Sequence, residues 1–67
     1  MIRHIAYGKR ADVISECSAA DFDRECPYLV AIVGDGEHDP AGAMTLTEAK
    51  ATARMFAAEA GCGILRI

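Results

Sequence analysis

The stretch Tyr28-Leu29-Val30-Ala31-Ile32-Val33 is apolar at every position and contains two valines and an isoleucine. A strand with one solvated face alternates apolar and polar residues, whereas a strand covered on both faces is apolar throughout. We therefore expect this stretch to be a central strand of a sheet, with both faces buried. Residues 34–42, which are rich in glycine, acid and proline, should follow as a loop.

A helix is expected from Thr45 to Ala60. The sequence Thr45-Leu46-Thr47-Glu48 fits a capping box, in which the threonine hydroxyl and the glutamate carboxylate each accept a hydrogen bond from a free backbone N–H. Gly61 suits the left-handed position that ends many helices. At 100° per residue, one face of the helix carries Leu46, Ala49, Ala53, Phe56, Ala57 and Ala60.

The other elements are shorter. Residues 2–7 should form a strand that ends at Gly8, with Lys9 and Arg10 in a turn, and residues 64–67 should form a last strand. Residues 11–17 alternate imperfectly and suggest a strand, with a helix as the alternative, and Ser18 could cap a short helix that Pro27 closes. The predicted fold is a single α+β domain, residues 1–67. It has a three- or four-stranded, mainly antiparallel sheet, one main helix on one face and room for a second short helix.

The expected core is thin because many of its residues are alanines, which bury little area. It should combine the helix residues Leu46, Ala53, Phe56 and Ala57 with Leu29, Ala31 and Val33, or with the opposite parity of that strand. One helix covers one side of a sheet, so the far side needs either residues 18–25 or a second chain. A homodimer built on the apolar strand is therefore one functional hypothesis.

Charge is distributed unevenly along the chain. Residues 12–39 hold eight acids against one arginine, a formal charge of −7, whereas the other residues hold six bases against two acids. Such a stretch repels nucleic acid and attracts basic surfaces. We therefore expect no direct nucleic-acid binding and take the acids as candidate residues for binding a basic protein: Asp12, Glu16, Asp21, Asp23, Glu25, Asp35, Glu37 and Asp39.

Catalytic, metal and redox motifs are not evident. Asp35, Glu37 and Asp39 begin like a calcium loop, but Pro40 stands where that loop needs glycine and Leu46 where it needs an acid. No spacing marks a nucleophile with its base, a zinc site or a phosphate loop. The prediction is a protein without enzymatic activity, cofactor or metal; the alternative is a weak metal or thiol site using His38, Asp35, Asp39 or a cysteine.

The three cysteines, Cys17, Cys26 and Cys62, are far apart and include no C-x-x-C pair. With no secretion signal, an odd number of cysteines argues for reduced thiols, although a Cys17–Cys26 pair stays open. No apolar run reaches the roughly 18 residues that a membrane span requires. We therefore expect a cytoplasmic protein with no membrane partner.

In size, acidity and layout the chain resembles the small single-domain inhibitors that phages encode, anti-CRISPR proteins especially. The resemblance extends over the whole chain. It rests on the acidic stretch from Asp12 to Asp39, the compact sheet with its helix, and the lack of a catalytic set. It implies an inhibitor that docks on a basic, nucleic-acid-binding surface of a host effector protein, for example a CRISPR effector subunit, and blocks it.

Overall fold

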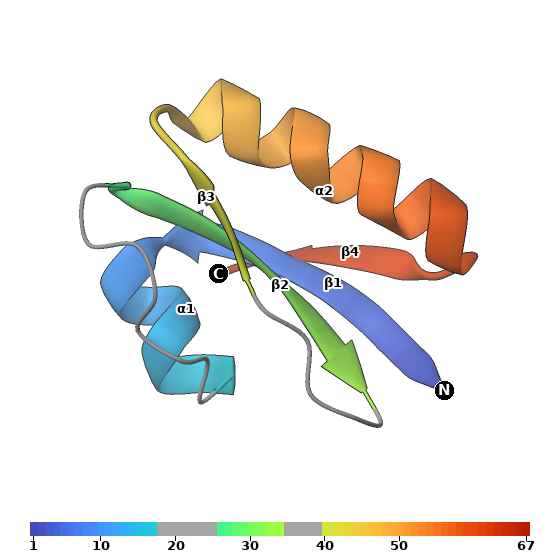
Figure 1. Cartoon of the computed structure of the whole chain (residues 1–67). Helices are drawn as coiled ribbons and strands as arrows, with labels where there is room; N and C mark the ends of the chain where they lie inside the picture. The colour runs from blue at the N-terminus through green and yellow to red at the C-terminus, as the bar shows by residue number, and fades with distance from the viewer. Residues whose placement is uncertain (18–25, 35–39) are drawn as a thin grey trace.

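The computed structural model describes residues 1–17, 26–34 and 40–67. They form an α+β fold in which a four-stranded sheet carries a long helix and a short one (Figure 1). In chain order the elements are β1 (Ile2–Lys9), α1 (Arg10–Cys17), β2 (Tyr28–Gly34), β3 (Ala41–Ala43), α2 (Leu46–Ala60) and β4 (Gly63–Arg66).

The sheet has the strand order β3-β2-β1-β4. β2 pairs antiparallel with β1, where Ala6 faces Ala31, and antiparallel with β3 on its other side. β4 pairs parallel with β1, with Leu65 beside Ala6. The predicted α+β class and mainly antiparallel sheet are therefore confirmed, and the parallel pair lies at one edge.

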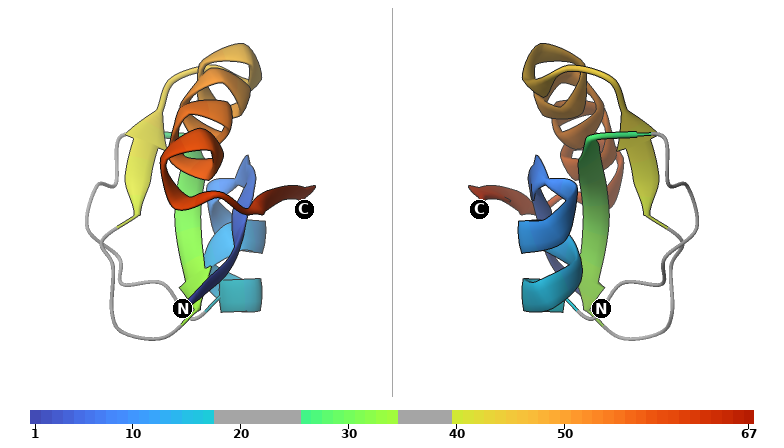
Figure 2. Two further views of the ribbon diagram at one scale, coloured as in Figure 1. Left: turned by 90° about the vertical axis from the view of Figure 1, so that its right-hand side faces the viewer. Right: turned by 90° about the vertical axis from the view of Figure 1, so that its left-hand side faces the viewer.

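The two helices lie on opposite faces of the sheet, as the side views show (Figure 2). Successive strand residues point to opposite faces. Val30 accordingly joins Ile5 and Tyr7 beneath α2, while Leu29 and Ala31 pack with Val13 of α1. β2 is thus a central strand covered on both faces, as its apolar sequence predicts.

The sequence allowed two alternating sets of β2 residues beneath α2: Leu29, Ala31 and Val33, or the positions between them. The structure has the second set. Leu29 and Ala31 are buried, but they lie in the cluster under α1, and Val33 is only half-buried. The residue of β2 that is fully buried beneath α2 is Val30. Periodicity alone cannot choose between the two parities, because every residue of this strand is apolar.

Residues 10–17 form helix α1, so the strand expected over 11–17 is wrong and the helical alternative is right. Lys9 belongs to β1 and Arg10 begins the helix, which leaves no separate turn between them. Val13 is fully buried and Ile14 packs against the same cluster. Because α1 covers the far face of the sheet, a second chain is not needed there. The helix expected from Ser18 lies outside the described residues.

Helix α2 begins and ends as predicted. The Thr45 side chain accepts a hydrogen bond from the Glu48 N–H at 3.1 Å, and a Glu48 carboxylate oxygen accepts one from the Met44 N–H at 3.0 Å. Gly61 ends the helix in the left-handed conformation, with φ 69°, and its N–H donates to the Ala57 carbonyl at 2.8 Å.

Alanines supply the buried face of α2: Ala49, Ala53 and Ala57. Leu46 and Phe56 are half-buried at the margin of the core, and Ala60 is exposed, contrary to its expected place on the inward face. Small side chains let the helix axis approach the sheet closely. The larger residues therefore lie at the border of the contact and not at its centre.

Candidate functional site

Two of the predicted partner-binding acids lie in the described part of the chain. Asp12 is exposed in the first turn of α1, and Glu16 belongs to the last part of the same helix. The other six candidates fall outside the described residues: Asp21, Asp23, Glu25, Asp35, Glu37 and Asp39.

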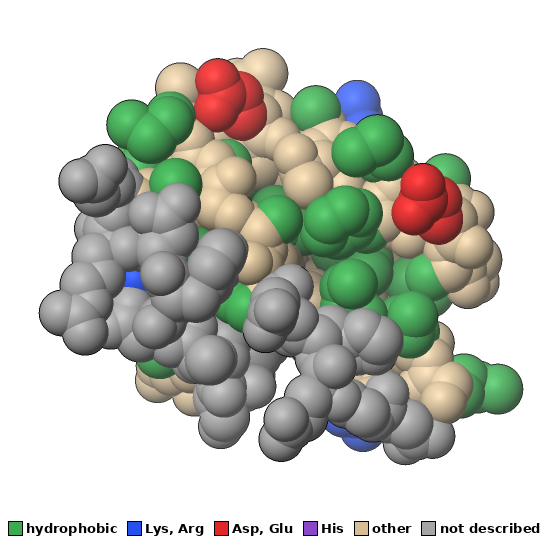
Figure 3. All heavy atoms as spheres, viewed as in Figure 1, with side chains coloured by type: hydrophobic (Ala, Val, Ile, Leu, Met, Phe, Trp, Pro, Cys, Tyr) green, Lys and Arg blue, Asp and Glu red, His purple; other side chains and the backbone are tan. Residues whose placement is uncertain are grey.

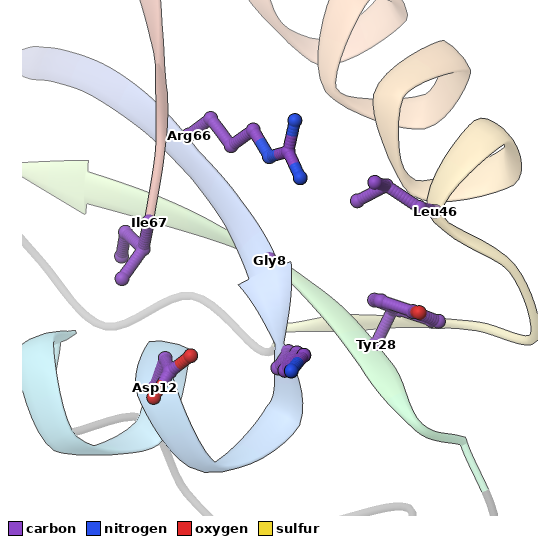
Figure 4. Close-up of a pocket in the computed structure, with 7 residues that line it drawn as sticks. Gly8, Asp12, Tyr28, Leu46, Arg66 and Ile67 are labelled. Atoms are coloured by element: carbon purple, nitrogen blue, oxygen red, sulfur yellow. The ribbon is translucent and has the colours of Figure 1, made fainter.

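Asp12 lies among basic residues rather than with other acids. It lines a shallow pocket of about 160 Å³ at the C-terminal end of β1, together with Lys9, Tyr28 and Arg66. Figure 4 shows Asp12 on the α1 side of this pocket and the Arg66 side chain extending towards Leu46 at the start of α2. A carboxylate in the first turn of a helix is stabilised by the helix dipole, so the position of Asp12 has a structural reason of its own.

The same end of the sheet forms a basic pole, defined here as Lys9, Arg10 and Arg66. The Arg10 guanidinium donates to the Cys26 carbonyl at 3.3 Å, and the Arg10 backbone N–H donates to the Pro27 carbonyl at 2.9 Å. Arg10 thereby fixes the place where the chain enters β2, directly beside the start of α1.

Both acid-rich segments begin at the opposite end of the molecule, and the first of them leads back to Cys26 at the basic pole. The last residue of α1, Cys17, and the last residue of β2, Gly34, lie at this end together with the N-terminus (Figure 2). Residues 18–25 follow Cys17 and residues 35–39 follow Gly34. These two segments hold six acids against Arg24, a formal charge of −5, whereas the described residues hold six bases against four acids, or +2.

The structure thus places two of the eight candidate acids. Asp12 lies beside Lys9 and Arg66 at the basic pole. Six of the candidates belong to residues 18–25 and 35–39, outside the described part of the chain. Sequence reasoning missed the basic pole because Lys9 and Arg66 are far apart along the chain and meet only through the parallel pairing of β4 with β1.

An apolar hollow of about 240 Å³ lies on the α2 face of the sheet. Figure 3 shows hydrophobic side chains gathered on this face beside α2. Phe56 lines the hollow instead of filling the core, and Met55 beside it in sequence is 57% exposed. The full lining is Ile2, Ile5, Ile32, Phe56, Glu59 and Ala60.

Among the described residues there is no group of three or more His, Cys, Asp or Glu side chains that could hold a metal ion. His4 is half-buried in β1, and Cys62 is a half-buried free thiol. His38, Asp35 and Asp39 lie outside the described residues, and so does the Cys17 side chain. The weak metal or thiol site and the Cys17–Cys26 pair therefore stay predictions.

No known family model, curated protein or solved structure matches this chain. Of the helices in the described residues, neither α1 nor α2 has the length and apolar character to span a bilayer.

Proposed function

We propose that this protein is a small acidic inhibitor of the anti-CRISPR kind, acting in the cytoplasm of a host cell. It binds a basic, nucleic-acid-binding surface of a host effector protein and blocks that surface. The observation that supports this proposal is the division of charge between the described residues, with a formal charge of +2, and residues 18–25 and 35–39, which together carry −5.

The physical argument is electrostatic. Carboxylates concentrated in two short segments of a small domain attract a groove lined with lysine and arginine and orient the protein as it approaches. The same carboxylates occupy positions that phosphates take in the groove, so binding of this protein and of nucleic acid exclude one another. The two segments hold six acids and one cation, Arg24, which favours a protein partner over nucleic acid itself.

Binding proteins need no nucleophile, base or cofactor, and the proposal assigns none. The partner residues are the acids of the two segments: Asp21, Asp23, Glu25, Asp35, Glu37 and Asp39. Glu16 at the end of α1 joins them, whereas Asp12 does not.

The test begins with capture of a partner from host lysate and measurement of its affinity by biolayer interferometry. Charge reversal at Asp21, Asp23 and Glu25, or at Asp35, Glu37 and Asp39, should abolish binding while the circular dichroism spectrum is unchanged. Affinity should fall as salt rises, because screening acts over about 8 to 10 Å at physiological ionic strength. Nucleic acid should compete for the captured partner.

A matched control separates local from overall charge. Asp35→Asn with Glu37→Gln and Asp39→Asn raises the net charge by three, and so does the set Thr47→Lys, Ala51→Lys and Ala58→Lys on the exposed side of α2. The first variant should lose binding and the second should keep it. Equal affinity of all variants for the captured partner would show that the acidic segments do not make the contact.

A further inference from the structure

Among residues 1–17, 26–34 and 40–67, β4 is an edge strand that pairs on one side, with β1. It lies at the end of the strand order, next to β1, and all four of its residues are exposed. Ile64 is 41% exposed and Leu65 is 48% exposed, on opposite faces of the strand. An apolar edge strand with open backbone groups is a template for pairing with another strand.

The backbone of β4 indicates which groups are open. The Ile67 N–H donates to the Tyr7 carbonyl at 2.8 Å, so the backbone groups of Ile67 point towards β1. Along a strand these groups alternate in direction, which makes Leu65 face β1 as well. The N–H and C=O groups of Ile64 and Arg66 therefore point outwards, to the free side of the edge.

We infer that β4 pairs antiparallel with β4 of a second copy of this chain, about a two-fold axis that passes beside Leu65. In this register Ile64 exchanges both of its backbone hydrogen bonds with the partner's Arg66, and Arg66 does the same with the partner's Ile64. All the outward backbone groups of the two residues are then satisfied. The two sheets become one continuous sheet, and this exposed edge disappears.

A second copy fits this edge because the strand is complementary to itself in that register. Leu65 meets the partner's Leu65 in a non-hydrogen-bonded pair, the closer kind of antiparallel pair, with Cα atoms about 4.5 Å apart. Ile64 lies beside the aliphatic stem of the partner's Arg66, so no two like charges face each other across the pair. A register centred on Ile64 would place Arg66 opposite the partner's Cys62, and in this chain the Cys62 N–H already donates to the Ala57 carbonyl.

This inference differs from the homodimer that the apolar strand suggested, because β2 is central and covered on both faces. It is also independent of the proposed inhibitor function. The acidic segments begin after Cys17 and Gly34, and neither of these residues belongs to β4.

Disulfide trapping tests the register. In a background with Cys17, Cys26 and Cys62 replaced by serine, Leu65→Cys should form a cross-linked dimer on mild oxidation. The expected Cα separation lies within the roughly 4.4 to 6.8 Å range of disulfides. Ile64→Cys is the matched control on the same strand, and its cross-linking should be at least tenfold lower because its neighbour is the partner's Arg66. Equal cross-linking of both variants would overturn the proposed register.

Light scattering on the unaltered chain tests the dimer itself, and a dimeric mass is expected at high micromolar concentration. Ile64→Pro removes an outward N–H without touching the ladder to β1, so this variant should be monomeric with an unchanged circular dichroism spectrum. A monomeric mass for the unaltered chain would overturn the inference, and it would leave the inhibitor proposal untouched. A dimeric mass for a folded Ile64→Pro variant would also overturn it.

Discussion

Gly8 of β1 lies directly against the backbone of Ile67. A Cβ atom at position 8 would stand 2.5 Å from the Ile67 carbonyl oxygen and 3.4 Å from its carbonyl carbon. Beside this contact, the Ile67 N–H donates to the Tyr7 carbonyl at 2.8 Å. The first strand and the last residues of the chain are therefore joined through a close backbone approach that glycine permits and a side chain obstructs.

Gly8→Ala should destabilise the protein, because the added methyl group would stand 2.5 Å from the Ile67 backbone oxygen and one of the two must shift. We expect a loss of about 1 to 3 kcal/mol in the free energy of unfolding, the usual cost of overpacking. Urea denaturation followed by circular dichroism measures it. Gly63→Ala is the control, since a Cβ at Gly63 has nothing within 4 Å. Equal losses in the two variants would contradict the close contact.

Leu29→Ala should cost more stability than Phe56→Ala. Leu29 is 0% exposed, and truncating a buried leucine costs about 2 to 5 kcal/mol. Phe56 is half-buried and borders the apolar hollow, so its removal leaves less of a cavity than the sequence suggests. Thermal or urea melts of both variants would decide the order. A larger loss for Phe56→Ala would mean that the core is centred on α2 and not on β2.

Thr45→Ala should remove the N-cap of α2 and lower the free energy of unfolding by about 1 kcal/mol. The reason is that the Glu48 N–H loses its acceptor, which lies 3.1 Å away on the Thr45 side chain. Thr45→Ser keeps the hydroxyl and should melt close to the parent. Thr47→Ala is a control two positions later, at an exposed site inside the helix. If Thr47→Ala destabilised the protein as much as Thr45→Ala, the cap would not be the cause.

Gly61→Ala should cost about 1 kcal/mol because Gly61 holds a left-handed backbone, with φ 69°, that a Cβ disfavours. Steric contact does not contribute, since a Cβ at this position has nothing within 4 Å. Gly61→Asn should cost less, because asparagine tolerates this conformation better than alanine does. Denaturation midpoints of the two variants, measured together, test the order.

The sequence by itself determined the elements whose signals are local. The apolar run of β2 and the capping box and terminal glycine of α2 depend on neighbouring residues, and both elements lie where these signals predict. The region of α1 was expected first as a strand, and the region of β3 as part of a loop. Both expectations failed because each element is short. Among the α1 residues whose burial is described, 10–15, Val13 is the one that is fully buried, and β3 is three small residues.

Tertiary structure alone decided which charged residues of the described chain lie near one another. It also decided which backbone N–H and C=O groups point outwards from the edge of the sheet. The acids are plain in the sequence, but only the direction of α1 and β2 brings residues 18–25 and 35–39 to start from one end, while Asp12 goes to the basic pole. Two further features likewise depend on how the elements pack and pair. One is which residues of β2 lie beneath α2, and the other is the outward direction of the Ile64 backbone groups. The physical reason is that side-chain type is a property of one position, whereas proximity and hydrogen-bond pairing are set by contacts between segments distant in the chain.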